Sequence, residues 1–309
     1  MNHTRKERQY LTARRTAGRE NATDMSYTIF TDATTDSIKG LSAVQTIPMS
    51  VELEGECYSY GPGGNVDPER FYEELRGGVF ARTTQISPAE YYGQFQKYLE
   101  KGSDILYLCF SSGLSGTYQS SEICMEELRE QYPQRKILCV DSRSASVGAA
   151  VFVHEAAVRQ AQGMELEPLY QWLTEQRLNI CHWFTVEDLE FLKRGGRIGA
   201  ATAAVGTMLQ IKPLLHIDDG GKLEVVSKPR GRKKANAVML AKMESGWLPE
   251  ISRFVVIGHA GNLDSAQVLQ QEVSARFPDA EIQITEISPI IGAHTGPDML
   301  ALGYLGNNR

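Results

Sequence analysis

Cysteine is scarce in this chain, and its spacing argues against cross-links. Only five cysteines occur among 309 residues, and no two of them form a Cys-x-x-Cys pair. An odd count without paired spacing disfavours a disulfide framework and a structural zinc site. Cys109 and Cys139 fall inside apolar runs, where reduced cysteine behaves as a small hydrophobic residue. We therefore expect reduced cysteines, no bound metal and a cytoplasmic location.

Long apolar segments are also missing. The longest apolar runs, such as "RFVVIG" at residues 253–258, are far shorter than the roughly 18 residues that span a bilayer. We therefore expect no integral membrane segment. The composition, 42% apolar and 23% charged, is typical of a soluble globular protein, and the length allows two domains.

The common catalytic motifs are absent as well. The segment Gly113-Leu114-Ser115-Gly116 misses the G-x-S-x-G nucleophile motif, because its second glycine comes one place too early. No GxxxxGK[ST] phosphate loop occurs, and the six histidines include no HExxH pair. His154, His182 and His216 lie within helix or strand patterns, so we interpret them as structural.

The first 24 residues differ in charge from the rest. They hold six basic and three acidic residues, a net charge of +3, and since the whole chain carries −6 the remainder carries −9. Because this stretch has no apolar core, it does not resemble a secretory signal. We expect a disordered basic tail over residues 1–26. Met25 directly precedes the first strand pattern and is an alternative start of translation.

Strand and helix patterns alternate over the first half of the remaining chain. Asp67 with Pro68, and Ser87 with Glu90, mark two helix starts, and an apolar strand covers residues 104–110. Such alternation is typical of parallel βαβ units. The second half mixes helices with hairpins, one of which turns at "DDGG". We predict an α/β protein with a ligand between its two domains. The N-terminal α/β domain (27–175) has a mainly parallel sheet flanked by helices, and the C-terminal domain (176–309) is α+β.

Two loops rich in hydroxyl groups precede predicted helices. One follows the strand at residues 104–110 and contains Ser111, Ser112, Ser115 and Thr117; the other, "RTTQISP", contains Thr83 and Thr84. Ligands bind beyond the carboxyl ends of parallel strands, and helix N-termini favour anions. The two loops therefore indicate a small anion pocket, although helix capping and turn formation explain the same residues.

Seven segments, taken in order, resemble the DegV family of fatty-acid-binding proteins. The resemblance extends from Tyr27 almost to the end of the chain. The segments are "FTDATTDS", "TTQISP", "SSGLSGTYQS", "VDSRSASVG", "EDLEFLKRGGRI", "LQIKPLLHIDDGGKL" and "IGAHTGP".

The resemblance implies a carrier rather than a stand-alone catalyst. Members of the family bury one long-chain fatty acid between two domains and present its carboxylate to a separate fatty acid kinase, which makes acyl phosphate from ATP. No other cofactor is implied. An enzyme acting alone, either an acyl hydrolase or a small-molecule kinase, is the alternative; His294 beside Ser112 would imitate a base–nucleophile pair. The positions that match the family's ligand-binding residues are Thr83 with Thr84, Ser112 with Ser111 and Gly113, Arg197 and His294.

Two positions depart from the family pattern, and one charged segment lies outside its motifs. Ile86 replaces the usual proline, and Asp298 stands where glycine is expected. The segment "KPRGRKK", residues 228–234, holds five basic residues in seven. A solvated face and a docking site for the kinase both explain it. We do not expect nucleic-acid binding, because the chain is acidic overall and shows no recognition motif.

Overall fold

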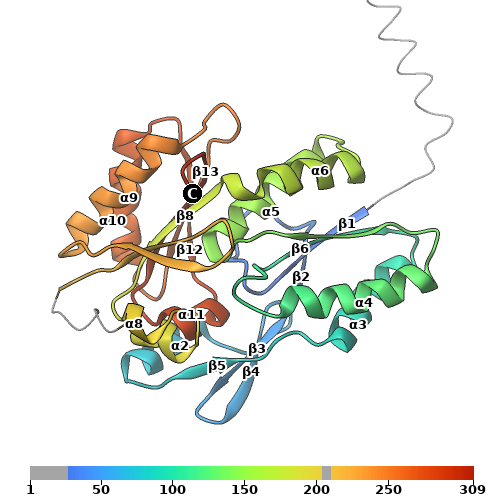
Figure 1. The fold of residues 1–309 in the computed structure, drawn as a ribbon, viewed down its shortest axis with the longest axis horizontal. Coiled ribbons are helices and arrows are strands. Elements are labelled where there is room, and N and C mark those ends of the chain that lie inside the picture. Colours follow the sequence, from blue (N-terminus) through green and yellow to red (C-terminus); the bar gives the residue numbers. More distant parts are fainter. Residues whose placement is uncertain (1–26, 204–209) are drawn as a thin grey trace, which may run out of the picture.

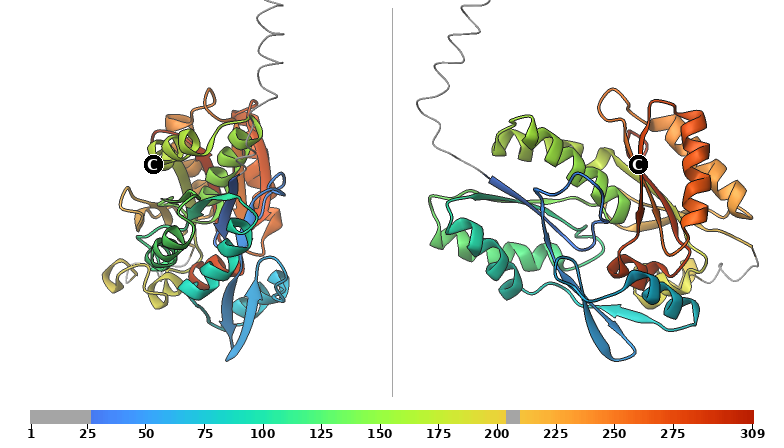
Figure 2. Two further views of the ribbon diagram at one scale, coloured as in Figure 1. Left: turned by 90° about the vertical axis from the view of Figure 1, so that its right-hand side faces the viewer. Right: turned by 180° about the vertical axis from the view of Figure 1, so that it is seen from behind.

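The chain folds around three β-sheets. The computed structural model describes residues 27–203 and 210–309, so the predicted basic tail lies outside the described residues. Figure 1 shows the two larger sheets on opposite sides of the central helix α5 (Ser146–Ala161), which contacts strands of both. The view from behind in Figure 2 shows the same division.

The first sheet is entirely parallel, as the alternating pattern predicts. Its strands run in the order β2-β1-β6-β7, which places their carboxyl ends along one edge. Helices α3 and α4 pack against β6 and β7, and α6 packs against β7. The elements are β1 Tyr27–Asp32, β2 Gln45–Ile47, β6 Asp104–Cys109, β7 Ile137–Asp141, α3 Pro88–Leu99, α4 Thr117–Gln131 and α6 Leu166–Gln176.

The second sheet is mixed and has six strands. Its order is β10-β9-β8-β13-β11-β12, and only the β11–β12 pair is parallel. The central strand β13 joins β8 to β11, and it was not foreseen from the sequence. Helices α9 and α10 cover the outer face of this sheet (Figure 1). The elements are β8 Ile180–Thr185, β9 Leu214–Ile217, β10 Leu223–Ser227, β11 Phe254–His259, β12 Glu281–Glu286, β13 Leu300–Leu305, α9 Arg232–Gly246 and α10 Leu263–Arg276.

A small antiparallel sheet and five short helices complete the described fold. The sheet runs in the order β4-β3-β5 and packs through β3 and β5 against α11 near the end of the chain. Strands β3 and β4 form an antiparallel hairpin, with φ of 52° at Glu54 and 86° at Gly55 in its turn. The elements are β3 Met49–Leu53, β4 Glu56–Tyr60, β5 Ala81–Thr83, α2 Pro68–Arg76, α7 Glu190–Arg194, α8 Ala200–Ala203, α11 Pro289–Thr295 and the 3₁₀ turn η1 Arg177–Asn179.

Helix capping follows the predicted chemistry. The Asp67 side chain accepts a hydrogen bond from the Glu69 backbone N–H at the start of α2. At the start of α3, Ser87 and Glu90 form a complete capping box, with each side chain bonded to the other residue's backbone N–H. These caps fix where the two helices begin.

Polar contacts join segments that are far apart in the sequence. The buried carboxylate of Asp36, after β1, accepts hydrogen bonds from Ser146 Oγ at 2.5 Å and from the Ser288 backbone N–H at 2.8 Å. Burial raises the pKa of Asp36 to about 7. Tyr72 Oη donates to the Ile287 carbonyl at 2.6 Å. These bonds fix the N-terminal half of the chain against α11 and the strand before it.

The two departures from the family pattern take structural roles here. Ile86 is buried, so its side chain adds to the core where proline is expected. Asp298 adopts φ of 60°, a conformation that favours glycine, which explains why glycine is the expected residue. The Asp298 carboxylate contacts Arg76 at 3.0 Å and Asn262 at 3.1 Å. These contacts offset part of the backbone strain.

The predicted fold class is confirmed, since a parallel N-terminal sheet flanked by helices is followed by an α+β half. The domain boundary between residues 175 and 176 stays a prediction. Within residues 27–203 and 210–309, no helix is both long and apolar enough to cross a membrane.

Candidate functional site

A cavity of about 190 Å³ lies among the ends of the parallel sheet, α5, α11 and the second sheet. Most of its lining is apolar, while one group of lining residues carries hydroxyl, amide, guanidinium and imidazole groups. We call Thr83, Thr84, Gln85, Ser115, Arg197 and His294 the polar group; Thr34, Ser146, His182 and Thr295 also line the cavity. The apolar lining includes Met49, Phe110, Val147, Phe184, Leu192, Ile217, Ile290, Ile291 and Met299. Such a lining suits an amphipathic ligand with one polar end.

The polar group is assembled from both halves of the chain. Thr83 ends the edge strand β5, and its Oγ1 lies 2.8 Å from Nε2 of His294 on α11. Gln85 Nε2 donates to the Gly116 carbonyl at 3.0 Å. That bond ties the loop after β5 to the loop before α4, and Thr84 and Ser115 both line the cavity. Ser115 Oγ also accepts a hydrogen bond from the Thr117 backbone N–H at 3.2 Å and lies 2.8 Å from Thr117 Oγ1.

Arg197 carries a positive charge without a compensating carboxylate among the described residues. It follows the glycine pair that ends α7, as the sequence predicts. Its Nε donates to the Leu114 carbonyl at 3.2 Å, and its Nη1 donates to the Gly195 carbonyl. Burial lowers the pKa of Arg197. A half-buried guanidinium that meets only main-chain carbonyls is matched to a ligand that brings its own negative charge.

His294 is held in its neutral form. Burial, and secondarily the nearby charge of Arg197, lower the pKa of His294 to about 4. Nε2 contacts Thr83, whereas Nδ1 is buried and has no hydrogen-bond partner in the described structure. At neutral pH the ring therefore adds polar atoms to the cavity without adding charge.

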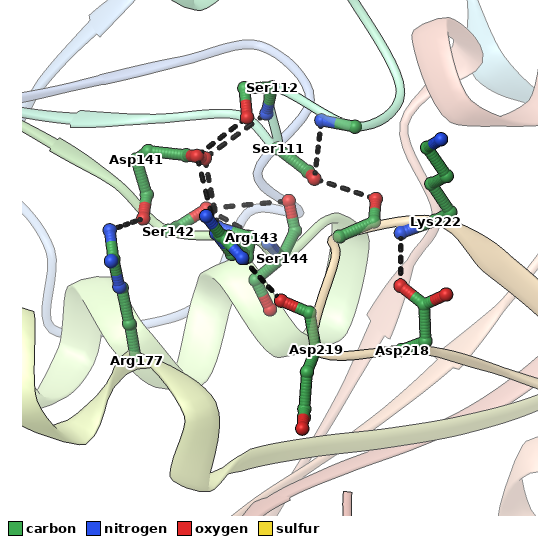
Figure 3. Close-up of polar contacts among 12 residues, drawn as sticks. Ser111, Ser112, Asp141, Ser142, Arg143, Ser144, Arg177, Asp218, Asp219 and Lys222 are labelled. Atoms are coloured by element: carbon green, nitrogen blue, oxygen red, sulfur yellow. Dashed lines mark hydrogen bonds and ion pairs between the residues drawn. The ribbon is translucent and has the colours of Figure 1, made fainter.

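Ser111, Ser112 and Gly113 do not line this cavity, although Gly113 lines a hollow beside it, and the ligand-binding role expected for the three residues stays a prediction. Ser112 Oγ donates to the Asp141 carboxylate at 2.6 Å, and its backbone N–H donates to the same group at 3.1 Å. Ser111 Oγ donates at 2.7 Å to the carbonyl of Gly221, in the turn between β9 and β10. Figure 3 shows both serines directed toward these partners.

These contacts explain why several hydroxyl-bearing residues follow β6. Asp141 ends the neighbouring strand β7, so its carboxylate fixes the start of the loop. A Cβ on Gly113 would lie only 2.5 Å from the Gly221 carbonyl oxygen, so the two loops meet backbone to backbone. Ser111 and Ser112 thus position the loop, and Ser115, three residues further on, reaches the cavity. Sequence spacing alone does not distinguish these serines.

Comparisons with known proteins identify the family of this chain. The family model described as "Uncharacterised protein, DegV family" matches residues 26–307. A DegV domain-containing protein of Clostridium perfringens is 35% identical over 286 residues, covering 92% of this chain and 98% of the relative. The chain belongs to the DegV family.

Solved structures share the fold. A structure titled as fatty acid binding of a DegV family protein from Thermus thermophilus has a TM-score of 0.80 and 32% identity. It is covered completely and covers 91% of this chain. The Streptococcus pneumoniae Fatty Acid Kinase (Fak) B3 protein, loaded with linoleic acid, has a TM-score of 0.81 with 20% identity, and the match covers 92% of this chain and all of that one. The latter likeness concerns the fold alone.

Proposed function

We propose that this protein is a fatty-acid carrier that buries one long-chain fatty acid and exposes its carboxylate to a separate fatty acid kinase. The observation that carries the proposal is the cavity itself, which combines a mostly apolar lining with Arg197, a positive group that has no carboxylate partner in the described chain. Burying an acyl chain contributes about 0.8 kcal/mol per CH₂. Charge-assisted hydrogen bonds offset the cost of removing the carboxylate from water.

Five residues of the polar group have a role in this proposal. Thr84 and Ser115 offer hydroxyl donors, and Arg197 keeps the acid ionised and oriented. Thr83 and His294, already paired with each other, provide a neutral wall beside the head group. A carboxylate held by donors remains nucleophilic, as phosphoryl transfer from ATP requires. The chain would then act as a binding subunit in the cytoplasm and would need no cofactor of its own.

The alternative of an acyl hydrolase finds less support in this geometry. Its base–nucleophile pair was expected between His294 and Ser112, but Ser112 bonds to Asp141 and His294 bonds to Thr83. A hydrolase also needs a group that orients its histidine. His294 Nδ1 has no such partner among the described residues.

Lipid binding and its dependence on Ser115 test the proposal. We expect the delipidated protein to take up palmitate at one molecule per chain. Ser115→Ala should weaken palmitate binding about tenfold, because a hydrogen bond to a charged group contributes about 1.5–3 kcal/mol. The matched substitution Ser112→Ala should change affinity less than about threefold, since that hydroxyl serves Asp141. Both affinities are measured by isothermal titration calorimetry.

Three results would contradict this scheme in different ways. Absence of stoichiometric palmitate binding by well-folded wild-type protein would reject the carrier function. A larger loss in Ser112→Ala than in Ser115→Ala would retain the carrier but reject the head-group assignment. Ester hydrolysis that disappears in Ser112→Ala would favour the hydrolase.

The basic segment at residues 228–234 is a proposed docking surface for the kinase. Arg232 does not belong to that surface, because its guanidinium bonds to Thr185 at 2.5 Å and to Glu187 at 2.7 Å. Arg230 and Lys233 are exposed, and surface charge acts mainly on encounter with a partner. The segment thus divides into one arginine that is bonded within the fold and exposed cations such as Arg230 and Lys233.

Reversing two of these charges should slow phosphorylation by the kinase without changing the binding of the fatty acid. We expect Arg230→Glu/Lys233→Glu to lower turnover by the cognate kinase about tenfold at low salt while palmitate affinity stays unchanged. Raising the salt concentration should lower kinase turnover with the wild-type protein toward the value for the variant. Lys97→Glu/Lys101→Glu on and just after α3 is the matched control. Equal kinase turnover in both double variants would identify the segment as a merely solvated face.

A further inference from the structure

A second hollow, of about 360 Å³, adjoins the polar end of the cavity. Leu114, Arg197 and Leu223 line both spaces, so the Arg197 side chain stands between them. The rest of its lining comes from Gly113, from the loop after α7, from Thr202 on α8 and from Lys222 just before β10. A group attached to the head of a bound ligand would extend into this hollow.

The charge of the hollow is positive. Arg197 and Lys222 contribute to its lining, and no aspartate or glutamate does. The Lys222 backbone N–H donates to the Asp218 carboxylate at 2.9 Å, but Figure 3 shows its side chain extending away from that group. Neither Arg197 nor Lys222 forms an ion pair with a carboxylate in the part of the chain that the structure describes. Two uncompensated cations converging on one hollow favour an anion.

A missing side chain leaves the hollow open. Gly199 lines it, and a Cβ built on Gly199 would meet no atom of residues 27–203 or 210–309 within 4 Å. Its φ lies outside the left-handed region that favours glycine. Neither packing nor backbone conformation therefore requires glycine at this position. Any larger side chain there would occupy space that is now free for a ligand.

We propose that this hollow holds the phosphoryl group of an acyl phosphate, the product of the proposed kinase reaction. In that reaction a carboxylate oxygen attacks the terminal phosphorus of a nucleoside triphosphate, so a C–O–P bond forms as the bond to the leaving nucleoside diphosphate breaks. The acyl chain and carbonyl stay in the cavity, and the new phosphoryl group needs space and positive charge immediately beside the former carboxylate. The hollow supplies both, with Lys222 and Thr202 as donors on the side of Arg197 that faces away from the cavity.

This inference rests on the proposed carrier function and names a second ligand for the same site. It predicts that the protein binds the product with contacts that the substrate lacks. Lys222 should therefore discriminate between a carboxylate and a phosphorylated head group, whereas Arg197 should serve both.

The test compares two ligands with the same acyl chain. Palmitate represents the substrate, and 2-oxoheptadecylphosphonate represents palmitoyl phosphate, with a stable CH₂ in place of the bridging oxygen. We expect Lys222→Met to weaken phosphonate binding about tenfold and palmitate binding less than about twofold. Gly199→Leu, which fills the hollow, should weaken phosphonate binding at least as much. The matched controls are Lys97→Met and Gly93→Leu, which lie on α3 at another exposed lysine and another open glycine.

The outcomes separate the two proposals. If the wild type binds neither ligand, the carrier function itself fails. If palmitate binds while phosphonate affinity is unchanged in both Lys222→Met and Gly199→Leu, the phosphoryl site is rejected and the carrier remains. Equal losses for both ligands would also overturn the inference, because they would place the two residues at the carboxylate or in the fold. Thermal unfolding of each variant identifies the latter case.

Discussion

Replacing Arg197 with methionine is expected to lower the affinity for palmitate about 10- to 100-fold. The proposed carboxylate loses its one charged donor, and a charge-assisted hydrogen bond contributes about 1.5–3 kcal/mol. Methionine retains a similar apolar stem, so the packing around Leu114 should change little. The guanidinium bonds only to main-chain carbonyls, which limits the effect of the substitution on the rest of the fold.

A neighbouring arginine provides the control for this experiment. Arg194 is three residues away, but its side chain pairs with Glu190 at 3.0 Å and lies over the Phe80 ring, outside the cavity lining. Arg194→Met should leave palmitate affinity within about twofold, because exposed ion pairs contribute little. Similar affinities in Arg197→Met and wild type would mean that the carboxylate does not bind beside Arg197. Equal losses in both variants would indicate a general effect of charge.

The second large effect is expected in stability rather than binding. His294 has a pKa of about 4 in the folded protein and about 6.5 when unfolded. Because the unfolded chain takes up the proton first, this residue's contribution to stability is complete above about pH 6.5 and is lost as the pH falls toward about 4. Near pH 5 the loss reaches about 2 kcal/mol in the free energy of unfolding.

Comparing the pH dependence of unfolding in two proteins separates the contribution of His294 from that of other titrating groups. We compare delipidated wild type with His294→Gln, whose neutral amide can still bond to Thr83 but cannot titrate. Urea unfolding near pH 7 and near pH 5 should show that the wild type loses about 2 kcal/mol more than the variant. Identical pH dependence in the two proteins would mean that His294 is not buried in neutral form.

Local chemistry made much of the fold predictable. The caps at Asp67 and Ser87 act within one helical turn, so the sequence contains both the donor and the acceptor. The turn at Glu54-Gly55 is equally local. The strand β13 was not predicted, because it is defined by its pairing with β8 and β11. Both of these strands precede it by more than forty residues in the sequence. Its short apolar run has no local partner to identify it.

The residues of the candidate site were also predicted only in part. Thr83, Thr84, Arg197 and His294 were named from motifs, and the structure brings all four to one cavity. The serine was not identified in the same way. The motif "SSGLSGTYQS" has four serines, and Ser112 was expected at the ligand, whereas Ser115 lines the cavity.

The sequence by itself determined the family, the parallel first sheet and the residue types of the polar group, since these follow from ordered motifs and short-range patterns. Only the tertiary structure decided which hydroxyls face the cavity. The carboxylate of Asp141 at the end of the adjacent strand, and the Gly221 carbonyl from the second half of the chain, take the hydrogen bonds of Ser112 and Ser111. Those partners approach through sheet pairing and through packing between the two halves of the chain, and each hydroxyl hydrogen can be donated only once.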